Sequence, residues 1–196
     1  AIQVKGLELP AYDPRGAKAH GLNLATSNIG ADHNTGYAGQ EVFGAPVPFP
    51  VDRFEVARKG ELTKWNQDQT AMLETGIICS FVPSWGGITE ALFGRLLAAG
   101  MGIKDFADVD YLWRVGERIF NLERMFNVRE GFGSKDDYMP KRFMTESMLD
   151  GPSKGQVFEN DELLKDYYRV RGWNVRTGVP TAAKLKELGL SFAIGK

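Results

Sequence analysis

The single cysteine of this chain, Cys79, stands in the stretch ETGIICSF, with the carboxylate of Glu74 five positions upstream. A thiolate can bind metals, but one cysteine cannot form an internal disulfide or hold a zinc ion or an iron–sulfur cluster by itself. Two interpretations follow from these residues. Either Cys79 packs as a small buried hydrophobe, as free cysteines commonly do, or its partners lie outside this sequence.

The second residue that could do chemistry is His33, which follows Asp32 in a glycine-rich stretch. Imidazole titrates near neutral pH, so His33 can donate or accept a proton, although a structural role fits the same pattern. The other histidine, His20, is expected inside a helix and is assigned a structural role. The acidic stretches DFADVD and KDDY lack the spacing of a calcium loop and are predicted to be helix caps and solvated surface.

Helical patterns must position these residues, and they predict an all-α, multihelical fold with scarce strands. Residues 30–57, rich in glycine and proline, are predicted to be a long irregular loop, and loops of this length are usually functional. Six helices are predicted. The first starts at Asp13–Pro14, the second runs from Lys59 to near Cys79, and the third stops at Gly100. The fourth covers residues 108–127, the fifth is capped by Asn160 or Asp161, and the last ends at Gly189.

The clearest periodicity lies in residues 108–127. The positions that follow i, i+3, i+4, i+7 spacing are Val109, Leu112, Trp113, Gly116, Ile119, Phe120 and Phe126. This spacing predicts an amphipathic helix that buries one face. The whole chain, 1–196, is interpreted as a single helical domain, with a subdivision near residues 100–105 as the alternative.

Composition limits the function classes. The net charge of −1 gives no electrostatic reason to expect nucleic acid or an anionic membrane, and no apolar run approaches the ~20 residues that span a bilayer. One cysteine, no N-x-S/T sequon and no signal-peptide pattern favour a cytoplasmic location. GxGxxG, P-loop, CxxC, HExxH and GxSxG motifs are absent from the sequence. The start at Ala1, in mid-phrase, suggests a piece of a longer polypeptide.

Phrases along nearly the whole sequence resemble one family in the expected order. They are LPAYDPRGAKAHGLNLATSNIGADHNTGY, ETGIICSF, RIFNLERMFNVREGF, PKRF, DGPSKG and LLKDYYRVRGWNVRTGVPTAAKLKELGL. Together they resemble the C-terminal domain of the tungsten-containing aldehyde:ferredoxin oxidoreductases. The resemblance implies a larger enzyme whose N-terminal and middle domains, with this one, enclose a tungsten bis-pterin cofactor (or its molybdenum analogue) and one 4Fe-4S cluster.

The resemblance assigns Cys79 as the fourth cluster ligand, the other three coming from the middle domain. The family pattern before this cysteine is Asp-x-x-Gly-Leu-Cys, and here Glu74 keeps the carboxylate that accepts hydrogen bonds from the pterin. Ile78 keeps the apolar position whose backbone contacts the cofactor, whereas Gly76 stands one place earlier than the family glycine. Neither cofactor is expected to bind to this chain alone.

His33 follows a phrase of the family, Ser-Asn-x-Gly-Ala-x-His, whose histidine lies beside the tungsten. The resemblance implies that His33 is catalytic, as a hydrogen-bond or proton donor. Thr35 stands where family members often carry a basic residue, so it is a candidate cofactor-binding residue, and Ile29 replaces a second basic residue. Cys79 and His33 are therefore expected on one shared, partly exposed surface.

The implied function is oxidation of small aldehydes to carboxylic acids with ferredoxin as electron acceptor, in an enzyme that forms a homodimer at full length. One alternative within the family is a related tungsten or molybdenum enzyme that works reductively. Another, from a different class, is a non-catalytic helical scaffold that has lost the cofactors. The sequence does not select the aldehyde or the metal.

Overall fold

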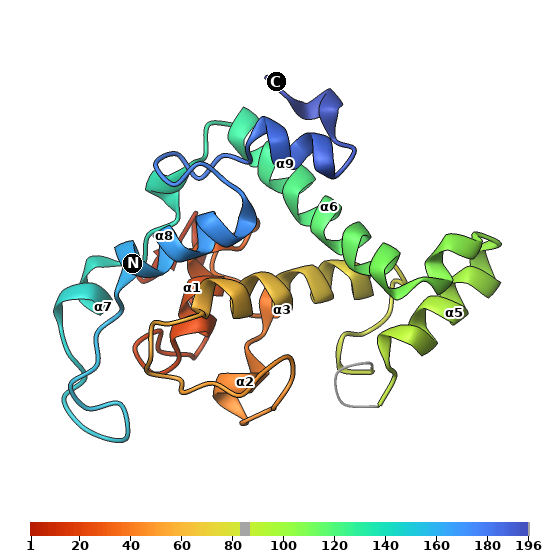
Figure 1. Cartoon of the computed structure of the whole chain (residues 1–196). Helices are drawn as coiled ribbons and strands as arrows, with labels where there is room; N and C mark the ends of the chain where they lie inside the picture. Colours follow the sequence, from red (N-terminus) through yellow and green to blue (C-terminus); the bar gives the residue numbers. More distant parts are fainter. Residues whose placement is uncertain (83–86, 196) are drawn as a thin grey trace.

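The computed structural model describes residues 1–82 and 87–195, and helices dominate it. Two long helices, α3 (Lys59–Glu74) and α6 (Val109–Arg129), pack against each other and converge toward one end of the molecule (Figure 1). On one side of this contact α1 (Lys18–Thr26) and α8 (Asn160–Arg171) pack against α3. On the other side α5 (Glu90–Met101) and the 3₁₀ turn η2 (Lys104–Ala107) form an arm (Figure 1).

Short elements complete the fold. They are α2 (Gly39–Val42), α7 (Lys141–Thr145), α9 (Ala182–Glu187), η1 (Asn34–Gly36), η3 (Ser134–Asp136) and η4 (Ser191–Ala193). The described strands are β1 (Gln3–Val4) and β2 (Leu7–Glu8), an antiparallel hairpin. The prediction of an all-α multihelical fold is confirmed. No helix in the described ranges has the length and apolar character needed to cross a membrane.

The amphipathic helix predicted at 108–127 is confirmed as α6. Asp108 caps its start by accepting a hydrogen bond from the Asp110 N–H at 2.9 Å. Gly116 lies where α6 meets α3, and a Cβ there would be 2.1 Å from the Asp68 carbonyl oxygen, so only glycine permits this approach. Phe126, although part of the predicted apolar pattern, is 56% exposed.

The prediction that the helix after Lys59 reaches Cys79 is wrong, because α3 ends at Glu74. The Thr75 hydroxyl donates to the Met72 carbonyl oxygen at 2.6 Å, and Ile77 has the left-handed φ of 52°. A threonine hydroxyl that bonds to the preceding turn competes with the helix, and a left-handed residue ends it. Cys79 therefore lies on an irregular segment beyond the helix.

Two other predicted boundaries are also wrong. The first helix begins at Lys18 rather than at Asp13–Pro14, because the Asp13 carboxylate accepts the backbone N–H and guanidinium of Arg15 and closes a local turn instead. The helix predicted to stop at Gly100 continues to Met101, and Gly102 supplies the left-handed residue at φ 72°.

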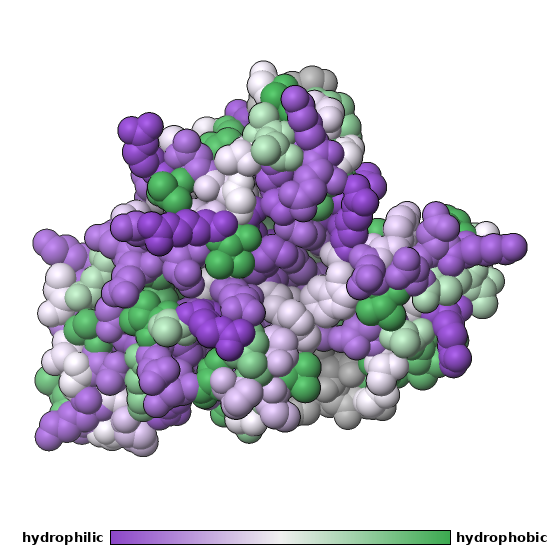
Figure 2. Space-filling model, in the orientation of Figure 1, coloured by the Kyte–Doolittle hydropathy of each residue, from purple (hydrophilic) through white to green (hydrophobic). Residues whose placement is uncertain are grey.

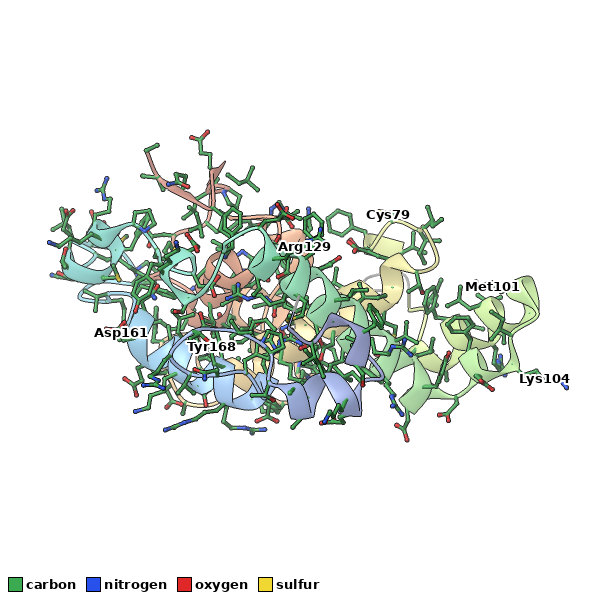
Figure 3. The ribbon with its side chains drawn as sticks, turned by 90° about the horizontal axis from the view of Figure 1, so that it is seen from above. Cys79, Met101, Lys104, Arg129, Asp161 and Tyr168 are labelled. Carbon is green, nitrogen blue, oxygen red and sulfur yellow. The ribbon has the colours of Figure 1, made fainter. Side chains whose placement is uncertain are left out.

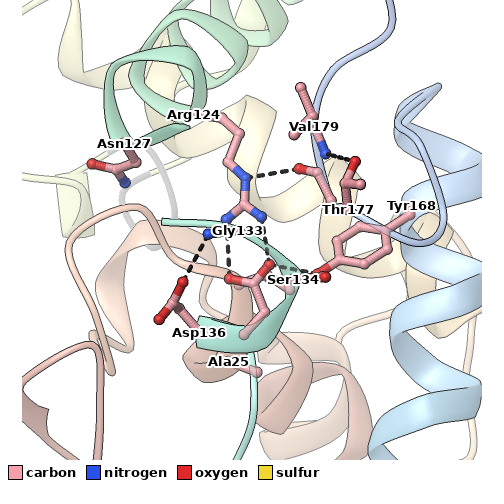
Figure 4. A network of polar contacts seen from close by, with 12 residues as sticks. Ala25, Arg124, Asn127, Gly133, Ser134, Asp136, Tyr168, Thr177 and Val179 are labelled. Carbon is pink, nitrogen blue, oxygen red and sulfur yellow. Dashed lines mark hydrogen bonds and ion pairs between the residues drawn. The ribbon is translucent and has the colours of Figure 1, made fainter. Parts of the chain in front are cut away.

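The stretch KDDY is not all surface, which corrects a further prediction. Asp137 is fully buried and accepts hydrogen bonds from Arg124 at 3.0 and 2.7 Å and from the Tyr168 hydroxyl at 2.5 Å. Figure 4 shows the polar network around Arg124 and Tyr168. Lys5 adds an ion pair to Asp137 at 2.6 Å. Burial alone would raise the pKa of Asp137, but the Lys5 and Arg124 charges outweigh it, and the net pKa is lowered. This cluster fastens the N-terminal hairpin to α6 and α8.

Candidate functional site

The His33 ring packs against two tyrosines, whose own ring centroids are 5.8 Å apart, so that the three rings form a triangle. The His33 centroid is 5.5 Å from that of Tyr12 and 6.1 Å from that of Tyr37, and the two tyrosine hydroxyls lie 3.0 Å apart. His33 is half-buried, and within residues 1–82 and 87–195 neither of its ring nitrogens makes a hydrogen bond. The aromatic walls therefore hold the imidazole in place and leave its nitrogens available to a reacting group.

His20 lies behind these tyrosines and has the structural character predicted for it. It is fully buried, with its ring centroid 4.6 Å from Tyr12 and 5.1 Å from Tyr37. Its Nδ1 accepts the Ala38 N–H at 3.5 Å, and its Nε2 is buried without a partner in the described residues. Burial, and then the nearby charge of His33, lower the pKa of His20 to about 4, so the ring is neutral at physiological pH.

The turn that follows His33 is closed by side chains. The Asp32 carboxylate accepts the Thr35 N–H at 2.8 Å. The Thr35 hydroxyl bonds to the Asp32 carbonyl oxygen at 3.3 Å and to Asn23 Oδ1 at 3.4 Å. Thr35, predicted as a cofactor-binding residue, thus uses its hydroxyl within the chain, where it fixes the backbone that carries His33.

Glu74 and the His33 segment approach each other at the end of α3. The pKa of Glu74 is raised, first by partial burial and then by the negative charges of Glu123 and Asp32. Glu123, on α6, accepts a hydrogen bond from Asn28 Nδ2 at 3.1 Å, and burial raises its pKa as well. The negative charges of Glu123 on α6 and Asp32 in the loop therefore act on Glu74, and a hydrogen-bond donor supplied to Glu74 would stabilise its ionised form.

Cys79 is exposed and lies at an edge of the molecule (Figure 3), so the expectation of an accessible thiol is confirmed. Its neighbours are apolar and face solvent, Ile77 with 95% of its surface exposed and Ile78 with 38%. Cys79 and His33 make no direct contact in the described part of the chain. Their segments meet instead at one cavity, which is lined by Asn34 and Tyr37 from the first segment and by Ser80 and Phe81 from the second.

These residues fit the cofactors in part. The Glu74 carboxylate has no side-chain hydrogen bond in the described residues and can accept donors such as the amino and ring N–H groups of a pterin. Cys79 can supply one thiolate, but the described residues contain no group of three or more histidine, cysteine or acidic side chains that could hold a metal ion. A cluster here would need its other ligands from outside this chain.

Four residues of this region were not selected from the sequence: Tyr12, Tyr37, Asp32 as a turn-closing group, and Glu123. Glu123 lies in the family phrase NLERMF, so the resemblance could have identified it as a candidate site residue. Tyr12 precedes His33 by 21 positions, and no local pattern connects two residues that only the fold brings together.

The fold and the site agree with the comparisons to known proteins. Residues 1–190 match the family model described as aldehyde ferredoxin oxidoreductase, domains 2 and 3. The chain belongs to this family of oxidoreductases, as its sequence resemblance predicted.

Curated relatives are named tungsten-containing aldehyde ferredoxin oxidoreductases. The Pyrococcus furiosus protein is 41% identical over 194 residues, which cover 97% of this chain and 31% of the relative. The Thermococcus kodakarensis protein is 39% identical over the same shares, and the Pyrococcus horikoshii protein is 42% identical over 95% of this chain and 30% of the relative. The chain thus spans about a third of the length of these relatives.

A solved structure has the same fold. It is the active-site complex BamBC of benzoyl coenzyme A reductase, bound to 1,5-dienoyl-CoA, with a TM-score of 0.64 over 95% of this chain and 31% of that chain. The sequence identity of 20% limits this likeness to the fold.

Proposed function

We propose that this chain forms part of a larger enzyme that oxidises aldehydes to carboxylic acids and passes the electrons to ferredoxin. In this reaction the aldehyde carbon gains an oxygen atom from water, two electrons leave to the acceptor, and three protons are released as the carboxylate forms. A tungsten bis-pterin cofactor, when bound, supplies the two-electron chemistry, and a 4Fe-4S cluster supplies single-electron transfer.

Each predicted site residue has a role in this proposal. Cys79 provides one thiolate to the cluster, Glu74 accepts hydrogen bonds from the pterin, and the backbone at Ile78 lines the cofactor. His33 exchanges a proton with the substrate or hydrogen-bonds to its oxygen, because its ring nitrogens are free and its ring is held by Tyr12 and Tyr37. Thr35 supports His33 through the Asp32 turn and has a second proposed role as a cofactor contact.

One observation carries the proposal: the two segments selected from the sequence converge in space. Glu74, five residues before Cys79, lies close enough to Asp32, the neighbour of His33, for their charges to interact. The same two segments line one cavity. A helical scaffold without cofactors would have no need for this convergence of an exposed thiol, an unpaired carboxylate and an open imidazole.

The test is metal analysis of the full-length protein, expressed with tungstate under anaerobic conditions, together with aldehyde-dependent reduction of ferredoxin. We expect tungsten, about four iron atoms per chain for one 4Fe-4S cluster, and ferredoxin reduction that requires an aldehyde. Metal without aldehyde-dependent reduction would favour a reductive enzyme of the family. Absence of both metals from folded full-length protein would favour the scaffold alternative.

A further inference from the structure

Residues 74–77 form a tight turn between the end of α3 and Cys79. The Ile77 N–H donates to the Glu74 carbonyl oxygen at 3.0 Å, which closes the turn. Ile77 has a φ of 52°, a left-handed conformation that is rare for a β-branched residue because its side chain crowds the backbone. Such a conformation persists where the surrounding structure imposes it. Contacts around the turn must therefore hold it in place.

One contact of this turn comes from α5. Gly76 has no side chain, and a Cβ built there would lie 2.8 Å from Cε2 and 2.9 Å from Cζ of the Phe93 ring. The next neighbour, the Leu73 carbonyl oxygen, would be 3.5 Å away, which is an ordinary contact distance. The Phe93 ring is therefore the group against which the turn packs, and glycine at position 76 permits this close approach.

The Phe93 ring is held from its other sides. It is 3% exposed and belongs to a small core with Leu73 of α3 and Leu112 of α6. At Gly94 the backbone of α5 comes so close to η2 that an added Cβ would be 2.3 Å from the Phe106 carbonyl oxygen. Because packed interiors leave little room for side chains to shift, the ring is the fixed partner of the contact and the turn is the partner that it holds.

The same turn connects the two residues proposed to meet the cofactors. Glu74 is its first residue, and Cys79 lies two positions beyond its last. The backbone of the turn therefore sets the distance between the carboxylate and the thiol. Groups that orient a metal ligand from behind affect metal binding strongly, even though they do not touch the metal.

We propose that Phe93 is a positioning residue of the cofactor site: its buried ring holds the turn at Gly76 and thereby fixes the position of the Cys79 thiolate relative to the Glu74 carboxylate. This proposal rests on the proposed function, in which Cys79 is a cluster ligand and Glu74 a pterin contact. It also gives a function to the arm formed by α5 and η2 (Figure 1), which supports the turn through this one ring.

The test is a pair of substitutions that should compensate each other. Gly76→Ala adds a methyl group that collides with the Phe93 ring and displaces the turn, and the backbone accepts alanine because the φ of Gly76 is not left-handed. Phe93→Leu removes the ring atoms that cause this collision, but it also withdraws the support. In the double variant the methyl group fills the space that the ring has left. The double variant should therefore be closer to the wild type than either single variant is, which is the sign of a direct interaction.

Hydrogen exchange follows the turn without any cofactor. Full-length protein purified free of tungsten and iron is exchanged into heavy water, and mass spectrometry reads the amides of residues 75–77. Their exchange should be about tenfold faster in each single variant, because the turn opens more often once it is displaced or unsupported. In the double variant it should return to within about threefold of the wild type. A double variant as disturbed as the two single variants together would overturn the proposal.

Loss of iron follows the consequence for the cluster. Full-length protein loaded with its cofactors is incubated with a ferrous-iron chelator, and the released iron is measured over time. Each single variant should lose iron about tenfold faster than the wild type, at the lower end of the ~10–100-fold cost of removing a group that orients a metal ligand. The double variant should recover most of this difference.

Two controls separate positioning from a general loss of packing. Phe106→Leu makes the same change in a residue that packs against the same small core and is not among the nearest neighbours of Gly76. Gly100→Ala adds a methyl group to α5 where no atom lies within 4 Å. Both should leave the two measurements within twofold of the wild type. Equal effects of Phe106→Leu and Phe93→Leu would overturn the proposal, and if Phe93→Leu does not fold, Gly76→Ala against Gly100→Ala still decides it.

The outcomes also separate this proposal from the proposed function. Iron in the wild type, with hydrogen exchange and iron loss unchanged in folded Gly76→Ala and Phe93→Leu, would overturn the positioning role and leave the cluster assignment standing. A full-length wild type that holds no iron, with compensation still seen in hydrogen exchange, would reject the proposed function and retain Phe93 as the support of the turn.

Discussion

The chain holds its two site segments in different ways. The His33 segment is fixed by contacts within the chain: Glu41 pairs with Lys59 at 2.5 Å and accepts the His20 N–H at 3.0 Å, and Gln40 bonds to Asn66 on α3. The predicted long loop is thus partly ordered into η1 and α2 and is tied to α1 and α3. Its residues reach their positions without help from another domain.

The Cys79 segment lacks comparable support in the described residues. The backbone of Cys79 accepts one hydrogen bond, from the Val82 N–H at 3.0 Å, and the apolar side chains around it face solvent. Exposed apolar groups next to a thiol are a feature of surfaces that another part of a protein covers. On the face seen in Figure 2, hydrophobic residues otherwise form small separate groups among hydrophilic ones. We therefore call the His33 segment the preformed half of the proposed site, because this chain holds it in place. The Cys79 segment is the exposed half, which we expect another domain to cover.

The largest expected effect is loss of the 4Fe-4S cluster, which would depend on the Cys79 segment and not on the His33 segment. Cys79→Ser in the full-length protein should remove the 4Fe-4S cluster, because a serine alkoxide is a poorer ligand for iron than a thiolate. Iron analysis and the cluster absorption spectrum measure this loss. In this chain by itself, where Cys79 is exposed, the same substitution should change the free energy of unfolding by less than about 0.5 kcal/mol.

Ser80→Ala is the control for this substitution, because it changes the adjacent side chain and leaves the thiol in place. It should keep the iron content of the wild type. A normal cluster spectrum in Cys79→Ser would show that this residue is not a cluster ligand.

The next largest effect concerns the preformed half. His33→Ala should lower turnover of the full-length enzyme by about 10²–10⁴-fold, as expected when a proton donor or acceptor is removed. Tungsten and iron contents should stay at wild-type values, because His33 is not proposed to bind the metal. Glu55→Ala, at an exposed position of the same loop and outside the cavity, should retain activity. Wild-type turnover in His33→Ala would return His33 to a structural role.

A pH effect tests how tightly the preformed half is packed. The pKa of His20 is about 4 in the folded chain and near 6.5 when the imidazole is free. Above pH 6.5 both states are neutral, whereas below it the unfolded state binds a proton that the folded state cannot. The free energy of unfolding should therefore fall by about 3 kcal/mol between pH 6.5 and 4 from this group.

Urea unfolding at pH 7.5 and 4.5, followed by circular dichroism, measures this loss. The carboxylates of the chain titrate in the same range, so the informative quantity is the difference between wild type and His20→Gln. The variant should lack the His20 part of the loss. An identical pH dependence in the two proteins would contradict the buried, neutral state of His20.

The smallest expected effect is the loss of stability when a methyl group is added at Gly36. A Cβ on Gly36 would lie 2.5 Å from Asn23 Oδ1 and 2.6 Å from Gln67 Cγ, so Gly36→Ala should destabilise the fold by about 1–3 kcal/mol. Gly100→Ala is its control, because no atom lies within 4 Å of that Cβ and the site is within α5. The control should be about 0.5–1 kcal/mol more stable than the wild type in the same urea titration.

The sequence predicted those parts of the fold that depend on local pattern. Helix α6 follows from its apolar spacing and its Asp108 cap, which need only neighbouring residues. The ends of α1 and α3 were missed because side-chain bonds at Asp13 and Thr75 compete with the helix, and such competition is decided by geometry.

The residues of the candidate site also fall into two groups, those selected from the sequence and those that only the fold brings to the site. Cys79, Glu74 and His33 were selected from family phrases, and their assigned roles remain predictions for the experiments above to decide. Tyr12, Tyr37 and Glu123 could not be selected, because they reach the site only through tertiary packing. The burial of Asp137 was also unpredictable, since its ion-pair partner Lys5 is far from it in the sequence.

The buried lysines have a practical consequence for chemical labelling. Lys5 pairs with Asp137, Lys59 with Glu41, and Lys18 with Glu159 and the Val157 carbonyl oxygen, and their side chains are almost completely covered. An amine-reactive reagent needs an accessible, unpaired amino group, so these three sites should stay unmodified while exposed lysines react. Mass spectrometry of their modification would then report, site by site, when the hairpin, α1 and α3 come apart.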